Sequence, residues 1–65
     1  MKTKFDIDVE LTGVNGNAFS VLSTVARALK KGGVTPKQID EFRSEAMSGD
    51  YDHLLQTCMK WVNVS

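Results

Sequence analysis

The chain has 65 residues, with eight Lys or Arg against eight Asp or Glu, so its formal net charge is zero. This length supports one domain, residues 1–65, with a small core, and the single cysteine, Cys58, excludes an internal disulfide. No apolar run approaches the ~20 residues that a membrane span needs, the N-terminus lacks a signal-peptide pattern, and an unpaired cysteine suits a reducing compartment, so we expect a cytoplasmic protein.

Residues 4–12 alternate between apolar and polar side chains, which predicts a strand with one buried face. The apolar side is formed by Phe5, Ile7, Val9 and Leu11. The polar side carries three carboxylates, Asp6, Asp8 and Glu10. These carboxylates are candidates for contact with a basic partner, and the alternative is a solvated face whose like charges discourage aggregation. Alternate strand residues lie ~6.5–7 Å apart, too far for one strand to chelate a metal tightly, so we expect no metal site.

Residues 13–17 have the composition of a turn, and Asn17, or alternatively Asn15, is expected to cap a helix over residues 18–31. Two glycines, Gly32 and Gly33, end this helix. Its apolar stripe is formed by Phe19, Leu22, Ala26 and Leu29, broadened by Val21, Val25 and Ala28.

The next helix has a strong start signal. Thr35 is a favourable N-cap, Pro36 falls at the first helical position and Gln38 at the third, which together form a capping box. The stripe that follows contains Ile39, Phe42, Ala46 and Met47. Ser48-Gly49 breaks this helix.

A third, shorter helix begins after Ser48 or Asp50, either of which is a suitable cap. Its stripe contains Tyr51, Leu54, Leu55, Cys58 and Met59. Residues 61–65 are compatible with a last helical turn, but their alternation and β-propensity favour a short strand.

The predicted order is strand, helix, helix, helix, strand. This is an α+β fold in which the two terminal strands pair into a two-stranded sheet packed on the helices. Three helices between two strands make parallel pairing the simpler geometry, whereas antiparallel pairs are commoner overall, so the direction stays open.

Three segments carry a resemblance to known sequences: residues 11–19 (LTGVNGNAF), residues 45–55 (EAMSGDYDHLL) and Trp61-Val62. The chain resembles small reading frames of phage and prophage genomes, for which no activity is established. The resemblance spans most of the chain, but its motifs specify turns and caps, so it implies no site residue. It implies only a small intracellular accessory protein of phage or prophage type.

Trp61 is the most informative residue for function. On a terminal strand it shares a face with Asn63, while Val62 and Val64 share the other face. If the valines face the helices, Trp61 is exposed and is a favourable interface anchor; the alternative is a tryptophan lying over the edge of the core. The candidate protein-binding residues are Trp61, Asn63, Asp6, Asp8 and Glu10.

The sequence offers no catalytic constellation. His53 and Cys58 are the only residues of their types, and five helical positions turn through ~500°, so they point ~140° apart. Cys58 belongs to the apolar stripe and is expected in the core, whereas His53 is expected to be solvated or to cap a helix end. We therefore expect no enzyme and no cofactor.

The leading hypothesis is a non-enzymatic protein-binding module that acts on a host or phage protein and homodimerises through a sheet edge or a patch around Trp61. The alternative is a nucleic-acid-binding regulator that uses a basic cluster of Arg27, Lys30, Lys31 and Lys37. A neutral chain lacks a broad positive field, and the exposed face of the second helix is mostly acidic, which argues against this alternative.

Overall fold

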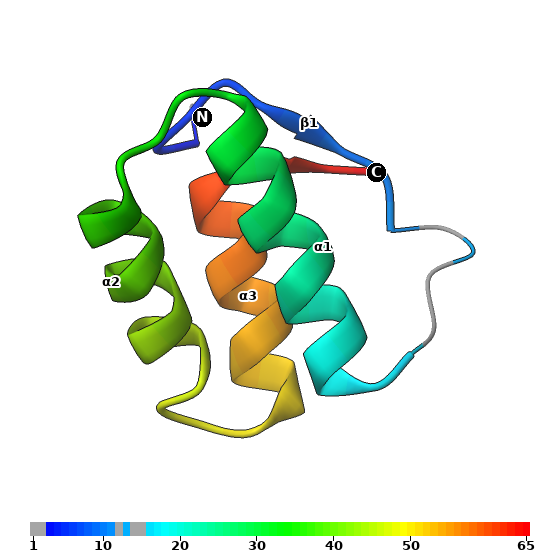
Figure 1. Cartoon of the computed structure of the whole chain (residues 1–65). Helices are drawn as coiled ribbons and strands as arrows, with labels where there is room; N and C mark the ends of the chain where they lie inside the picture. The colour runs from blue at the N-terminus through cyan, green and yellow to red at the C-terminus, as the bar shows by residue number, and fades with distance from the viewer. Residues whose placement is uncertain (1–2, 12, 14–15) are drawn as a thin grey trace.

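The computed structural model describes residues 3–11, 13 and 16–65. Its elements are β1 (Asp8–Val9), α1 (Ala18–Lys31), α2 (Pro36–Ala46), α3 (Tyr51–Trp61) and β2 (Asn63–Val64). The three helices pack side by side, and the two strands cross one end of them (Figure 1). The predicted α+β fold and its element order are confirmed. Within the described ranges, no helix combines the length and apolar character needed to cross a bilayer.

Each helix begins at a polar side chain that satisfies a free backbone N–H. Asn17, Thr35 and Asp50 each accept a hydrogen bond from the backbone N–H three residues further on, at 2.8, 3.3 and 2.9 Å. Pro36 occupies the first position of α2, where a missing N–H costs nothing. These caps confirm the predicted starts of all three helices and select Asp50 over Ser48. Asn15, the alternative cap for α1, lies outside the described residues.

The two strands are parallel, with Asp8 opposite Asn63 and Val9 opposite Val64. Regular strand covers only these residue pairs, a shorter stretch than the predicted strand over 4–12, whose last residue lies outside the described residues. The physical reason is that α3 continues to Trp61. Lys4 and Phe5 donate their backbone N–H groups to the carbonyls of Lys60 and Trp61, at 2.8 and 2.9 Å. The N-terminal segment therefore satisfies carbonyls that the end of α3 leaves free.

The core lies between the three helices and the inner face of the sheet. Its fully buried members include Val25, Leu29, Phe42, Cys58 and Val62. Four predicted stripe residues lie outside it: Phe19, Met47, Tyr51 and Met59 are exposed. The first three stand at helix ends, where they line a shallow surface hollow instead of the core. On α3, Thr57 is buried, whereas Met59 is exposed. Burial of this polar residue is tolerated because its hydroxyl donates a hydrogen bond to the His53 carbonyl at 2.8 Å.

Trp61 is the last residue of α3 and is only 3% exposed. Its ring lies 5.6 Å from that of Phe5 and 5.4 Å from that of Phe42, and the Lys4 ammonium stands 4.2 Å from its centroid. Of the two orientations that the sequence left open, the structure therefore selects a Trp61 packed on the core, and the prediction that Trp61 belongs to a strand is wrong. Because α3 extends to this position, the side chain follows the helical stripe of Leu54 and turns into the core.

Candidate functional sites

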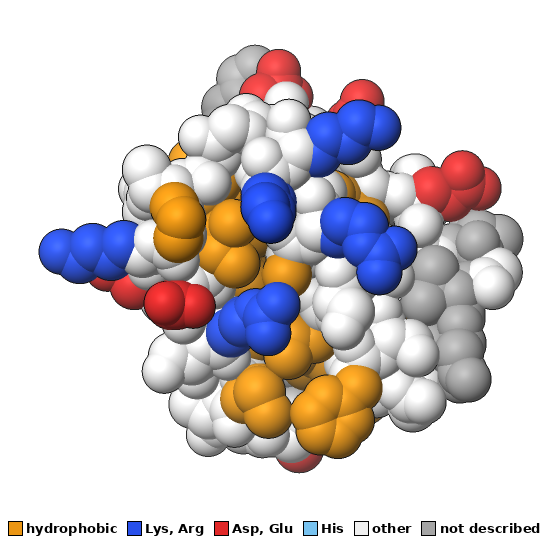
Figure 2. All heavy atoms as spheres, viewed as in Figure 1, with side chains coloured by type: hydrophobic (Ala, Val, Ile, Leu, Met, Phe, Trp, Pro, Cys, Tyr) orange, Lys and Arg blue, Asp and Glu red, His pale blue; other side chains and the backbone are white. Residues whose placement is uncertain are grey.

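An apolar patch covers the end of the helices furthest from the sheet. Phe19, Met47 and Tyr51 are 71%, 58% and 42% exposed, and all three line one shallow hollow of about 160 Å³. We call these three residues and their hollow the loop-end patch. Figure 2 shows hydrophobic side chains gathered on the lower part of the viewed face, near the start of α1 and the end of α2.

The loop-end patch is built by three helix termini. Phe19 is the second residue of α1, Met47 follows the last residue of α2, and Tyr51 opens α3. The floor of the hollow comes from Leu22, Ala46 and Leu54, which are buried. The patch is therefore continuous with the core, and its three exposed side chains add apolar surface that the fold leaves in water.

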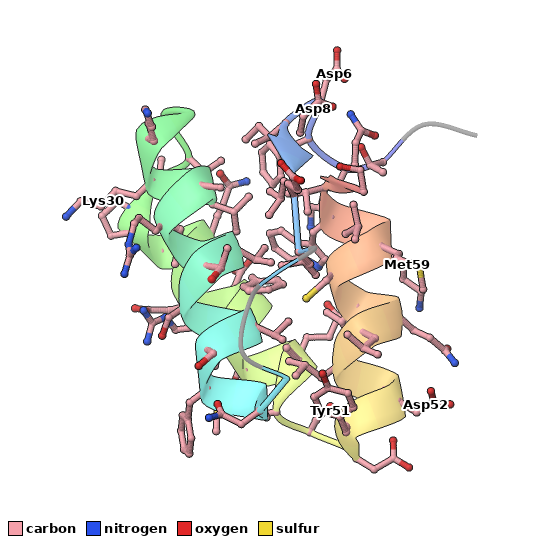
Figure 3. The ribbon with its side chains drawn as sticks, turned by 90° about the vertical axis from the view of Figure 1, so that its right-hand side faces the viewer. Asp6, Asp8, Lys30, Tyr51, Asp52 and Met59 are labelled. Atoms are coloured by element: carbon pink, nitrogen blue, oxygen red, sulfur yellow. The ribbon has the colours of Figure 1, made fainter. Side chains whose placement is uncertain are left out.

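The edge of the loop-end patch is acidic. Asp50 lines the hollow, and Asp52 is exposed beside Tyr51 at the same end of the molecule (Figure 3). Gly49 also lines the hollow, and a Cβ at this position would stand 2.8 Å from Cγ of His53. A side chain at residue 49 would therefore displace the imidazole ring and shift the turn that presents the patch.

His53 ties the end of α2 to the start of α3. Its Nε2 lies 2.8 Å from the Glu45 carbonyl, and the Ser48 hydroxyl donates to the same carbonyl at 2.6 Å. A carbonyl oxygen only accepts, so Nε2 carries the proton in this bond. That nitrogen cannot remove the proton of the Ser48 hydroxyl, 3.1 Å away. The pair is a helix-end cap, which agrees with the capping role expected for His53, and is not a nucleophile with its base.

Cys58 lies in the core, as expected from its place on the apolar stripe. Burial raises the pKa of its thiol to about 11, although a backbone hydrogen bond opposes this shift. The thiol therefore stays protonated at neutral pH and is a poor nucleophile. Among the described residues, no group of three or more His, Cys, Asp or Glu side chains is arranged to hold a metal ion.

The outer face of the sheet carries the predicted row of carboxylates. Asp6, Asp8 and Glu10 are exposed, and the Asn63 side-chain amide donates to the Oδ1 atoms of Asp6 and Asp8 at 2.9 and 3.1 Å. The structure thus brings four of the five candidate protein-binding residues to the sheet and places the fifth, Trp61, in the core. Asp6 and Asp8 lie at the end of the molecule opposite Tyr51 (Figure 3).

A basic groove lies between α1 and α2. Its cationic side chains are Arg27 and Lys30 from α1 and Arg43 from α2. The same groove is lined by Ser23, Ala26 and Ile39. Two of the four cations in the predicted basic cluster are therefore in the groove, whereas Lys31 and Lys37 are exposed outside its lining.

Sequence reasoning missed both Arg43 and the loop-end patch. Arg43 follows Ile39 by one helical turn, so it borders the apolar stripe where α2 meets a neighbour, and this spacing was the available signal. The exposure of Phe19 had no comparable signal, since it depends on where the other helices end.

Comparisons with protein-family models, with curated protein sequences and with solved structures gave no match.

Proposed function

We propose that this chain is a small non-enzymatic protein-binding module, an accessory protein of phage or prophage type, and that it binds its partner through the loop-end patch. The observation that carries the proposal is the exposure of Phe19, 71%, next to Met47 and Tyr51 around one apolar hollow. Fully burying a side chain such as Phe stabilises a complex by roughly 1.5–3 kcal/mol, and contiguous apolar patches on small proteins commonly mark interaction sites.

The hollow and its edge indicate the chemistry of the partner. A hollow of about 160 Å³ has room for one apolar side chain rather than for a large ligand. Asp50 and Asp52 at the edge favour a partner with Lys or Arg beside that side chain, because complementary charges around an apolar contact raise the association rate and fix its orientation. The partner is therefore a protein segment with an apolar anchor and basic flanks.

The loop-end patch replaces the Trp61 patch as the proposed binding surface. A second copy of the chain is the alternative occupant of the loop-end patch that the test below distinguishes, and the sheet edge is a weaker route to a dimer. Each free strand edge extends over only two regular residues, which offers few backbone hydrogen bonds to another chain.

The test is affinity capture from a bacterial lysate with the tagged chain and two methionine variants. Met47→Ser removes part of the loop-end patch, whereas Met59→Ser removes an exposed methionine on α3, 54% exposed, outside the hollow. We expect one stoichiometric protein to be retained by the wild type and by Met59→Ser, and to be lost with Met47→Ser and with Phe19→Ser.

Sedimentation equilibrium of the same variants distinguishes a foreign partner from a second copy. Self-association that disappears in Met47→Ser and persists in Met59→Ser identifies the chain itself as the occupant. A monomer at high micromolar concentration, together with capture of the same proteins by all variants, contradicts the proposal.

A further inference from the structure

The basic groove between α1 and α2 is a second surface whose chemistry differs from that of the loop-end patch. Arg27 and Lys30 lie one turn apart on α1, and Arg43 faces them from α2. In the described part of the chain, no carboxylate forms an ion pair with any of these three side chains. Three exposed cations therefore share one hollow of about 330 Å³ without an internal counter-charge.

The acidic residues of α2 do not neutralise the positive charge of this groove. Asp40, Glu41 and Glu45 are exposed on α2, but the lining of the groove contains Arg43 and Ile39 from that helix and none of these described carboxylates. Figure 2 shows several Lys and Arg side chains spread over the face where α1 and α2 meet, with the acidic side chains towards the margins. A chain of zero net charge thus has a locally positive face.

We propose that this basic groove binds the phosphate backbone of a nucleic acid, independently of the proposed protein contact. Guanidinium groups donate paired hydrogen bonds that match phosphate oxygens, and the Lys30 ammonium adds a point charge. The Ser23 hydroxyl in the lining is a further donor to a phosphate oxygen. The groove is open, and its cations come from two adjacent helices, so it suits an extended polyanion better than a small enclosed phosphate.

The groove contacts the backbone without reading the sequence. Its lining carries no aromatic side chain on which a base would stack and no Asn or Gln that would read a base edge. Binding is therefore expected to be weak, insensitive to base sequence and strongly dependent on salt. Lys31 and Lys37 are exposed on the same two helices, outside the lining, and add to the positive charge of α1 and α2.

The test is fluorescence anisotropy with a labelled 20-base-pair DNA duplex of mixed sequence, at several salt concentrations. Three phosphate contacts predict a slope of about −3 in a plot of log K against log salt concentration. Arg43→Gln is expected to weaken binding roughly tenfold at 0.1 M salt and to reduce the slope by about one. Lys60→Gln, which removes the same charge from α3 outside the groove, is the matched control and should leave the slope unchanged.

Two further probes limit the ligand class. Single-stranded DNA and a duplex RNA of the same length are expected to bind with similar salt slopes, because the groove reads phosphate rather than base or sugar. No binding of any nucleic acid at low salt overturns the proposal. Equal losses in Arg43→Gln and Lys60→Gln, or equally tight binding of a polyglutamate peptide of matched charge, also overturns it, since either result indicates non-specific charge attraction. Unchanged helical circular dichroism shows that each variant is folded.

Discussion

Phe19 and Trp61 show how strongly the burial of an aromatic side chain depends on its position within a helix. Phe19 lies on an apolar stripe and yet is mostly exposed, whereas Trp61 lies in a β-prone terminal segment and yet is buried between Phe5 and Phe42. The reason is position along each helix: Phe19 stands in the first turn of α1 and lines a surface hollow, whereas Trp61 at the end of α3 is covered by Phe5 of the N-terminal segment.

The difference in burial predicts a large effect on stability for the alanine substitution of Trp61 and a small one for that of Phe19. Trp61→Ala is expected to destabilise the fold by about 3–5 kcal/mol, because it removes a large core side chain and leaves a cavity. Phe19→Ala is expected to change the free energy of unfolding by no more than about 0.5 kcal/mol, as for other exposed positions. Urea unfolding followed by circular dichroism measures both values. A stable Trp61→Ala variant would show that the ring is not packed as described.

Among the elements, the short parallel sheet is the one that joins the two ends of the chain. Asn63 donates its backbone N–H to the Ile7 carbonyl at 2.8 Å, and Ser65 donates to the Val9 carbonyl at 3.0 Å. In the other direction, the backbone N–H of Leu11 donates to the Ser65 carbonyl at 2.9 Å. The pattern fixes which amides of β2 point towards β1.

Amide hydrogen exchange tests this pairing. We expect the amides of Asn63 and Ser65 to exchange more slowly than that of Val64, because in a parallel ladder alternate N–H groups of a strand point to the same neighbour. Contacts between the Val9 and Val64 side chains in resonance spectra are the matching observation. Equally fast amide exchange at residues 63–65 would contradict the pairing of β1 with β2. It would also contradict the placement of the N-terminal segment over Trp61.

For the whole molecule, one buried thiol links stability to pH. The folded-state pKa of Cys58 is raised from 9.0 to about 11 by burial. A raised pKa stabilises the fold fully below the unfolded-state value, and this contribution is lost as the pH rises through the folded-state value. Stability that depends on the protonated thiol is therefore expected to fall between about pH 9 and pH 11.

The measurement compares the wild type with Cys58→Ala over this range of pH. One proton contributes about 1.4 kcal/mol per pH unit, so the wild type should lose on the order of 2 kcal/mol more than the variant. Cys58→Ala also lowers stability at neutral pH by leaving a cavity, so the slopes rather than the absolute free energies are compared. Parallel curves for the two proteins would mean that the thiol ionises in the folded state as readily as in the unfolded chain.

The two proposed surfaces lie in different regions of the same small fold. The loop-end patch is apolar with an acidic edge, and the basic groove lies on the faces of α1 and α2. Because the two sets of lining residues share no member, Met47→Ser and Arg43→Gln are expected to act separately on protein capture and on DNA binding.

The sequence by itself determined the local structure of this protein. The caps at Asn17, Thr35 and Asp50, and the helices that follow them, depend on hydrogen bonds between residues three or four apart, which the sequence displays directly. The three helices, the order of elements and the core positions of Phe42 and Cys58 were predictable for this reason.

Only the tertiary structure decided the direction of the sheet, the end of α3 and the contents of both candidate sites. The Asn63 amide donates to Asp6 across 57 positions of sequence, and Arg43 of α2 lines the same groove as Arg27 of α1. Such contacts depend on where each helix ends relative to its neighbours. That relation follows from packing of the whole core. The periodicity of one helix therefore could not predict that Phe19 is exposed or that Trp61 is buried.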